Sequence, residues 1–131
     1  MTYLNNIKPT IKRTDKKKAV ALYIHIPFCK KKCPYCAFYK TEWHPEAEEK
    51  FIKAIEKEIN EYKNMNPKIR VKCLFFGGGT PSQISEKGLD RLLIALYEWF
   101  DIPQTVEKTM EVNPESITKE KLDIVGGAVA V

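Results

Sequence analysis

Apolar positions along the chain switch between runs typical of strands and spacings typical of amphipathic helices. Residues 20–26 are apolar, β-branched and aromatic, which predicts a strand. Residues 71–76 predict a second strand that is apolar on both faces, as expected of a buried parallel strand. Residues 106–112 predict a third strand, which is weaker because three charged residues interrupt it.

Three segments with helical character separate or follow these strands. The first begins at His44-Pro45, where proline suits the first turn and the acids that follow complement the helix dipole. The second is capped by Ser85 and stops at Pro103, and the third opens at Thr118 and runs through Leu122. The side chains expected to face the core are Phe51, Ile55, Ile59, Tyr62, Leu89, Leu92, Leu93 and Leu96.

The order strand–helix, repeated three times, predicts an α/β fold built of parallel βα repeats. Functional residues of such sheets gather where the strands end and the helices have not yet begun. Three unusual segments fall at that edge: a cysteine cluster after the first strand, residues 77–81 after the second, and residues 111–115 at the end of the third. Their coincidence predicts a single site.

Composition and charge narrow the class of protein. The chain is 44% hydrophobic and 30% charged, which predicts a folded domain. We expect a cytoplasmic protein, because no apolar run is long enough to span a membrane and no signal peptide is visible. The net charge of +5 lies in a basic N-terminal extension, residues 1–19, and residues 20–131 form the domain. We expect no nucleic-acid partner, because aromatic residues do not interleave with the lysines of the extension.

The cysteines carry the clearest chemistry. Cys29, Cys33 and Cys36 have the spacing C-x3-C-x2-C, and Cys73 stands apart. Three thiolates can hold an iron–sulfur cube and leave one iron free for a substrate or cofactor. A closed zinc site needs four ligands, so the alternative of a zinc-binding structural module requires a further ligand from His25, His44 or Cys73.

Together these motifs resemble a known superfamily. The cysteine spacing followed by Gly77-Gly78-Gly79-Thr80-Pro81 resembles the radical S-adenosylmethionine (radical SAM) superfamily. The strings Tyr23-Ile24-His25-Ile26-Pro27-Phe28-Cys29 and Glu111-Val112-Asn113-Pro114-Glu115 resemble one branch of it, the oxygen-independent coproporphyrinogen dehydrogenases and the related heme chaperones. The resemblance extends over about residues 22–122.

The resemblance implies cofactors and their ligands. Cys29, Cys33 and Cys36 would each bind one iron of a [4Fe–4S] cluster, and SAM would chelate the fourth iron. An electron from the cluster would then cleave the SAM sulfonium to give a 5′-deoxyadenosyl radical. The cofactor-binding positions that the resemblance implies are Tyr23, Tyr35, Phe38, Gly78, Gly79, Thr80 and Glu111. The residues alone leave other interpretations open: the tyrosines also suit a core, and Glu111 also suits an exposed strand end.

Phe38 distinguishes the two groups within the branch. The coproporphyrinogen dehydrogenases typically carry a cysteine at this position, whereas the heme chaperones carry phenylalanine, so this chain resembles the chaperones. The resemblance implies heme or a porphyrin and an electron donor as partners. The alternative activity is the oxidative decarboxylation of coproporphyrinogen III propionates.

The resemblance also implies a larger fold than this sequence provides. The family core is a partial barrel of about six βα units, and the chain supplies three, so residues 20–131 are expected to form the first half of a (β/α)6 barrel. Beyond Leu122 the sequence no longer resembles the family. We expect such a truncated domain to be poorly stable and inactive by itself, because half a barrel leaves a strand edge unpaired and apolar faces uncovered.

Overall fold

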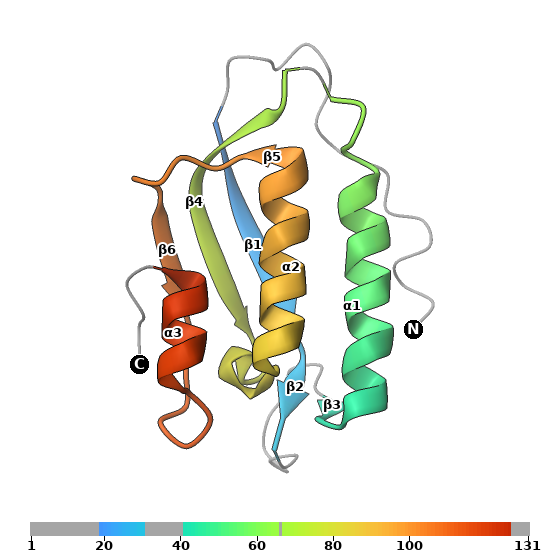
Figure 1. The fold of residues 1–131 in the computed structure, drawn as a ribbon, viewed down its shortest axis with the longest axis vertical. Coiled ribbons are helices and arrows are strands. Elements are labelled where there is room, and N and C mark those ends of the chain that lie inside the picture. The colour runs from blue at the N-terminus through green and yellow to red at the C-terminus, as the bar shows by residue number, and fades with distance from the viewer. Residues whose placement is uncertain (1–18, 31–40, 66, 127–131) are drawn as a thin grey trace.

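A computed structural model of the chain describes residues 19–30, 41–65 and 67–126. The main sheet is parallel throughout, with β4 in the middle, β1 on one side and both β5 and β6 on the other (Figure 1). Its strands are β1 (Val20–Ile26), β4 (Ile69–Gly78), β5 (Phe100–Asp101) and β6 (Glu107–Met110). A separate parallel pair joins β2 (Phe28–Cys29) to β3 (Thr41–Glu42). The fold is therefore α/β with parallel βα repeats, as the sequence predicts.

Helices α1 (Pro45–Asn60) and α2 (Glu86–Trp99) lie side by side on one face of this sheet, and α3 (Lys119–Val125) packs beside α2 (Figure 1). Each helix begins at a side-chain cap. His44 Nδ1 accepts from the amide of Ala47 at 3.2 Å, and Ser85 Oγ accepts from the amide of Gly88 at 3.0 Å. Thr118 Oγ1 caps α3 in the same way. All three caps satisfy amides that a helix leaves unpaired at its first turn.

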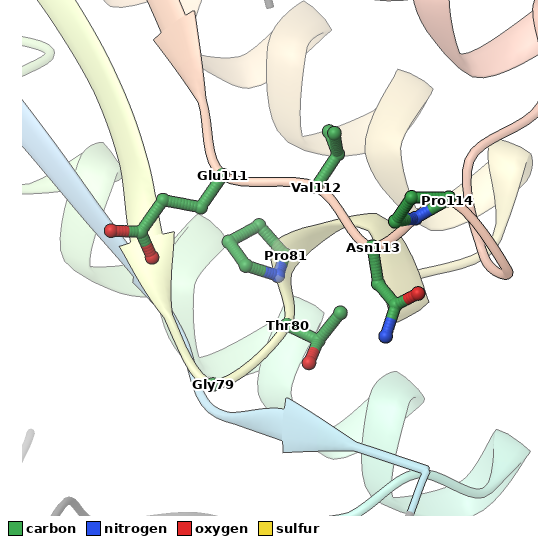
Figure 2. A pocket seen from close by; sticks show the side chains of 7 residues that line it. All are labelled: Gly79, Thr80, Pro81, Glu111, Val112, Asn113 and Pro114. Carbon is green, nitrogen blue, oxygen red and sulfur yellow. The ribbon is translucent and has the colours of Figure 1, made fainter. Parts of the chain in front are cut away.

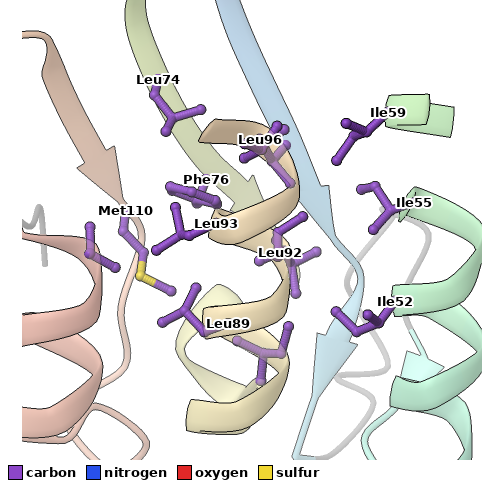
Figure 3. Packing of buried hydrophobic residues seen from close by; sticks show 14 of the residues in the cluster. Ile52, Ile55, Ile59, Leu74, Phe76, Leu89, Leu92, Leu93, Leu96 and Met110 are labelled. Carbon is purple, nitrogen blue, oxygen red and sulfur yellow. The ribbon is translucent and has the colours of Figure 1, made fainter. Parts of the chain in front are cut away.

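The core fills the space between the helices and the sheet. Its side chains come from the apolar stripes of α1 and α2 and from alternate positions of β1, β4 and β6 (Figure 3). The predicted core positions are buried with the exception of Tyr62, which is half-buried and packs against the cluster. This packing holds the carboxyl ends of β1, β4 and β6 in a common register.

The prediction that the second strand is apolar and buried on both faces is wrong. In β4 the helix-facing Leu74 and Phe76 are buried, whereas Arg70 and Lys72 are exposed and Cys73 and Phe75 are half-buried on the other side. The reason is that α1 and α2 both lie on one face, and no described element covers the opposite face. We call this opposite side the open face of the sheet.

Several element ends also differ from the sequence predictions. Helix α2 ends at Trp99, before Pro103, because the chain turns into the short strand β5. Strand β6 is limited to four residues, and α3 extends to Val125, where Gly126 ends it in the left-handed conformation at φ 61°. Within the described ranges no helix has the length and apolarity to cross a membrane. The basic extension over residues 1–19 lies almost wholly outside those ranges, so that division stays a prediction.

A buried carboxylate fixes α1 against α2 near the edge where the strands end. Glu48 accepts hydrogen bonds from the indole of Trp43 and from both the amide and the hydroxyl of Ser85. Gly88 allows this approach, since a Cβ there would collide with the Glu48 carboxylate. The start of α2, and with it the turn that leads from β4, is therefore anchored to α1.

Candidate functional site

The glycine-rich turn after β4 is bonded to the segment that leads into the cysteine motif. The amide of Gly79 donates to the carbonyl of Ile26 at 2.9 Å, and the amide of Thr80 donates to the carbonyl of Phe28 at 2.7 Å. These bonds continue the pairing of β1 with β4 beyond the ends of both strands. Two of the three segments that the sequence analysis placed at one edge are thus in direct contact.

Glycine is required at two positions of this turn. Gly78 has φ of 119°, which side chains rarely adopt, and a Cβ there would lie 2.6 Å from the Ile26 carbonyl oxygen. At Gly79, an added Cβ would lie 2.7 Å from the Phe28 carbonyl oxygen and 2.9 Å from the sulfur of Cys29. The thiol of Cys29 is therefore packed directly against the glycine turn.

The third segment joins the same edge through β6. The amide of Glu111 donates to the carbonyl of Phe76 at 3.0 Å, so the segment lies next to the turn that follows β4. A cavity of about 300 Å³ lies between residues 79–81 and residues 111–114. Figure 2 shows the two segments facing each other, with the exposed side chain of Glu111 directed toward β4 and those of Thr80 and Asn113 directed away from it.

Tyr23 lies on the open face of the sheet, not in the core. Its ring is 58% exposed, stacks on Phe75 with ring centroids 5.7 Å apart, and its hydroxyl lies 3.3 Å from Nδ1 of His25. A Cβ at Gly77 would lie 2.8 Å from both the Phe75 ring and the Tyr23 hydroxyl, so this glycine leaves room for the aromatic pair. Tyr23 and His25 therefore share one face of β1.

Several predicted site residues lie outside the described residues. These are Cys33, Tyr35, Cys36 and Phe38. Of the three cysteines of the motif, only Cys29 is described, and it is buried at the end of β2. Within the described ranges no three His, Cys, Asp or Glu side chains gather closely enough to hold a metal ion.

The structure separates one of the three candidates for a fourth zinc ligand, Cys73, from Cys29. Cys73 lies in the middle of β4 and pairs with Ala21 near the amino end of β1, away from the glycine turn. His44 follows Trp43, whose amide donates to the Cys29 carbonyl at 2.9 Å, and its Nδ1 is engaged as the cap of α1. His25 also lies near the site, since its ring approaches to 3.1 Å from the position of a Cβ on Gly78.

Sequence reasoning missed a polar cluster behind the cavity. It consists of Ser82, Ser116 and Lys121, which are joined by hydrogen bonds across two turns and α3. Ser82 is 0% and Lys121 7% exposed. Serine residues just after Pro81 and Glu115 look like ordinary turn residues, and a lysine in the first turn of a helix looks like a surface residue. Only the fold brings the three together.

Comparison with known proteins identifies the same superfamily that the sequence motifs resemble. Residues 23–129 match the family described as the radical SAM superfamily, so the prediction that the resemblance ends at Leu122 is wrong. The heme chaperone HemW of Buchnera aphidicola subsp. Schizaphis graminum is 34% identical over 103 residues, which cover 75% of this chain and 26% of the relative. The oxygen-independent coproporphyrinogen III oxidase of Salmonella typhimurium is 33% identical over 109 residues, covering 82% of this chain and 24% of the relative.

A solved structure shares the fold. The coproporphyrinogen III oxidase HemN of Escherichia coli, described as a radical SAM enzyme, superposes with a TM-score of 0.75 and 29% sequence identity. The match covers 86% of this chain and 27% of that protein. The chain thus spans about a quarter of the length of these relatives.

Proposed function

The chain belongs to the radical SAM superfamily, and from that premise we propose that it binds a [4Fe–4S] cluster and SAM at the edge where β1, β4 and β6 end. The proposed cluster ligands are Cys29, Cys33 and Cys36. The proposed SAM contacts are Tyr23, Tyr35, Phe38, Gly78, Gly79, Thr80 and Glu111. When bound, the cluster would supply the electron that cleaves the SAM sulfonium, which is chemistry that protein side chains lack.

The contact between Cys29 and Gly79 is the observation that carries this proposal. The buried sulfur of Cys29 lies against Gly79, and Gly79 itself lines the cavity. A cluster held by this thiolate and a ligand held by residues 79–81 would therefore be neighbours. The residues described at this edge fit such a pair, since a soft thiolate suits iron and a glycine turn admits a ligand close to the backbone.

The polar groups around the cavity suit the methionine end of SAM. The amides of Gly79 and Thr80 already donate hydrogen bonds to the carbonyls of Ile26 and Phe28, so they are not available to a ligand. The Thr80 hydroxyl and the carboxylate of Glu111 can accept hydrogen bonds at the cavity. Such acceptors match an ammonium group, and a carboxylate strengthens the contact through its charge.

Within the superfamily, we assign the chain to the heme-chaperone type. Phe38 stands where the coproporphyrinogen dehydrogenases carry the additional cysteine, and the relatives include the heme chaperone HemW. This assignment makes heme the partner and requires an electron donor. The second candidate is coproporphyrinogen III oxidation, supported by the Salmonella and Escherichia coli relatives. Since the chain spans about a quarter of these proteins, either activity is proposed for a protein that includes the rest of the barrel.

Anaerobic reconstitution with iron and sulfide tests the proposal. We expect the chain to turn brown and to bind about four irons and four sulfides per chain. The result follows from the three closely spaced cysteines of the motif, the first of which lies beside the glycine turn. Iron, sulfide and zinc should be measured on the same sample, together with the absorbance spectrum. About one equivalent of retained zinc without the brown absorbance would instead support the structural zinc module.

A further inference from the structure

Lys121 is a buried ammonium that joins two turns distant in the sequence. It lies in the first turn of α3, and its Nζ donates to the carbonyl of Ser82 at 2.7 Å and to the carbonyl of Ser116 at 2.8 Å. Ser82 follows the glycine turn, and Ser116 follows the segment that ends β6. The lysine therefore bridges the two segments that form the cavity.

The serine side chains add a second connection between the same turns. Ser82 Oγ lies 2.6 Å from Ser116 Oγ and accepts from the amide of Asn113 at 2.9 Å. The Ser116 hydroxyl also lies 3.2 Å from the carbonyl of Asn113, which fixes the shape of its own turn. Side-chain and backbone groups of the cluster are thus satisfied by one another.

This cluster lies directly behind the walls of the cavity. Pro81, in one wall, precedes Ser82, while Asn113, in the other wall, bonds to the Ser82 hydroxyl. The spacing between the walls therefore depends on the bonds that Lys121 and Ser82 make. Without them, the turns would be linked here mainly by the pairing of Phe76 with Met110 and by the bond from the Glu111 amide to the Phe76 carbonyl.

The burial of the Lys121 ammonium favours short hydrogen bonds to the carbonyls of both turns. Burial lowers the pKa of Lys121, whereas the negative charges of Glu86 and Glu48 act in the opposite direction. A buried ammonium is tolerated only where acceptors replace its water, so the two carbonyls must stay in position while the lysine is charged. Hydrogen bonds to charged groups are also stronger than neutral ones.

We propose that Lys121, acting with Ser82, is a positioning residue that holds the two walls of the cavity at the separation that SAM requires. This inference rests on the proposed function, because it concerns the same cavity. It assigns to the SAM site a residue that lies outside every motif of the sequence and does not line the cavity itself.

Variants of the full chain test this role through SAM affinity. Lys121→Met removes the ammonium and keeps an unbranched side chain, and Ser82→Ala removes the second connection. Lys119→Met is the matched control, since Lys119 is exposed in the same helix turn. After anaerobic reconstitution, equilibrium dialysis with SAM should give about 10-fold weaker binding for Lys121→Met, as is typical when a supporting residue behind a site is lost. Iron content should match the wild type, and Lys119→Met should bind SAM as the wild type does.

A double-mutant cycle separates positioning from general loosening of the fold. Because Lys121 and Ser82 act on the same two turns, the combined variant should lose less SAM affinity than the product of the single losses. Hydrogen exchange should increase in residues 79–84 and 111–117 of Lys121→Met and stay unchanged in α1. If Lys121→Met does not fold, Ser82→Ala alone decides the point, since it leaves no buried charge unpaired.

The outcomes distinguish this inference from the function on which it rests. A wild-type chain that takes up the cluster but binds no SAM contradicts the proposed function and removes the basis of the inference. Wild-type SAM affinity in both Lys121→Met and Ser82→Ala, on a background that does bind SAM, overturns the inference alone. Parallel loss of iron and SAM would also overturn it, because the lysine would then support the whole fold and not the cavity.

Discussion

Replacing Cys29 by serine is expected to abolish cluster assembly. The thiolate is the soft ligand that iron–sulfur clusters require, and a hydroxyl at the same position is a far weaker one. Loss of a residue that only supports a metal ligand weakens metal binding by roughly 10- to 100-fold. Because Cys29→Ser removes a direct ligand, we expect bound iron to fall by more than this. Iron and sulfide analysis of the reconstituted Cys29→Ser chain, with its absorbance spectrum, measures the effect.

Cys73 provides the matched control for this prediction. It is half-buried in β4, pairs with Ala21 and lies away from the glycine turn, so Cys73→Ser should retain the cluster. Cluster loss in Cys73→Ser with retention in Cys29→Ser would contradict the assignment of ligands. Equal loss in both variants would indicate damage to the sheet and not removal of a ligand.

Gly79→Ala should disrupt the site by displacing Cys29 from the glycine turn. The added methyl group would lie 2.7 Å from a backbone oxygen and 2.9 Å from the Cys29 sulfur, and the oxygen belongs to a strand that cannot move freely. Overpacking of this kind costs about 1–3 kcal/mol of stability. We therefore expect a lower urea midpoint, together with reduced iron uptake and weaker SAM binding.

Gly126→Ala is the control that separates an effect on the cluster site from a general loss of stability. Gly126 ends α3 at φ 61°, and the nearest atom to an added Cβ lies 3.8 Å away. Gly126→Ala should cost about 1 kcal/mol through backbone strain and leave iron uptake unchanged. Normal iron uptake and SAM affinity in Gly79→Ala would refute the claim that this turn and Cys29 form one site.

Much of the fold follows from local pattern. Val20–Ile26 is a strand with the predicted bounds, because its β-branched and aromatic residues suit a sheet and Pro27 ends it. Ser85 and Thr118 cap α2 and α3 as predicted, since a side-chain oxygen before a helical segment accepts from its free amides. The meeting of the glycine turn with residues 111–114 follows from the parallel topology alone.

The remaining features depend on tertiary structure. An apolar run cannot show which of its faces will be covered, so the open side of β4 was predicted as buried. The role of Lys121 is equally invisible in the sequence, because its two acceptors are backbone carbonyls, one of them 39 residues away. Charged residues near helix starts are usually solvated, and only the meeting of two turns with α3 makes this one buried.

The central claim is that the cluster and SAM occupy one site at the carboxyl edge of β1, β4 and β6. Electron paramagnetic resonance of the reconstituted, dithionite-reduced chain, recorded before and after addition of SAM, tests it most directly. We predict a reduced [4Fe–4S] signal whose shape and g-values change when SAM is added, because SAM would bind at the cluster. A cluster signal that stays the same at saturating SAM, or no cluster signal at all, would contradict the account.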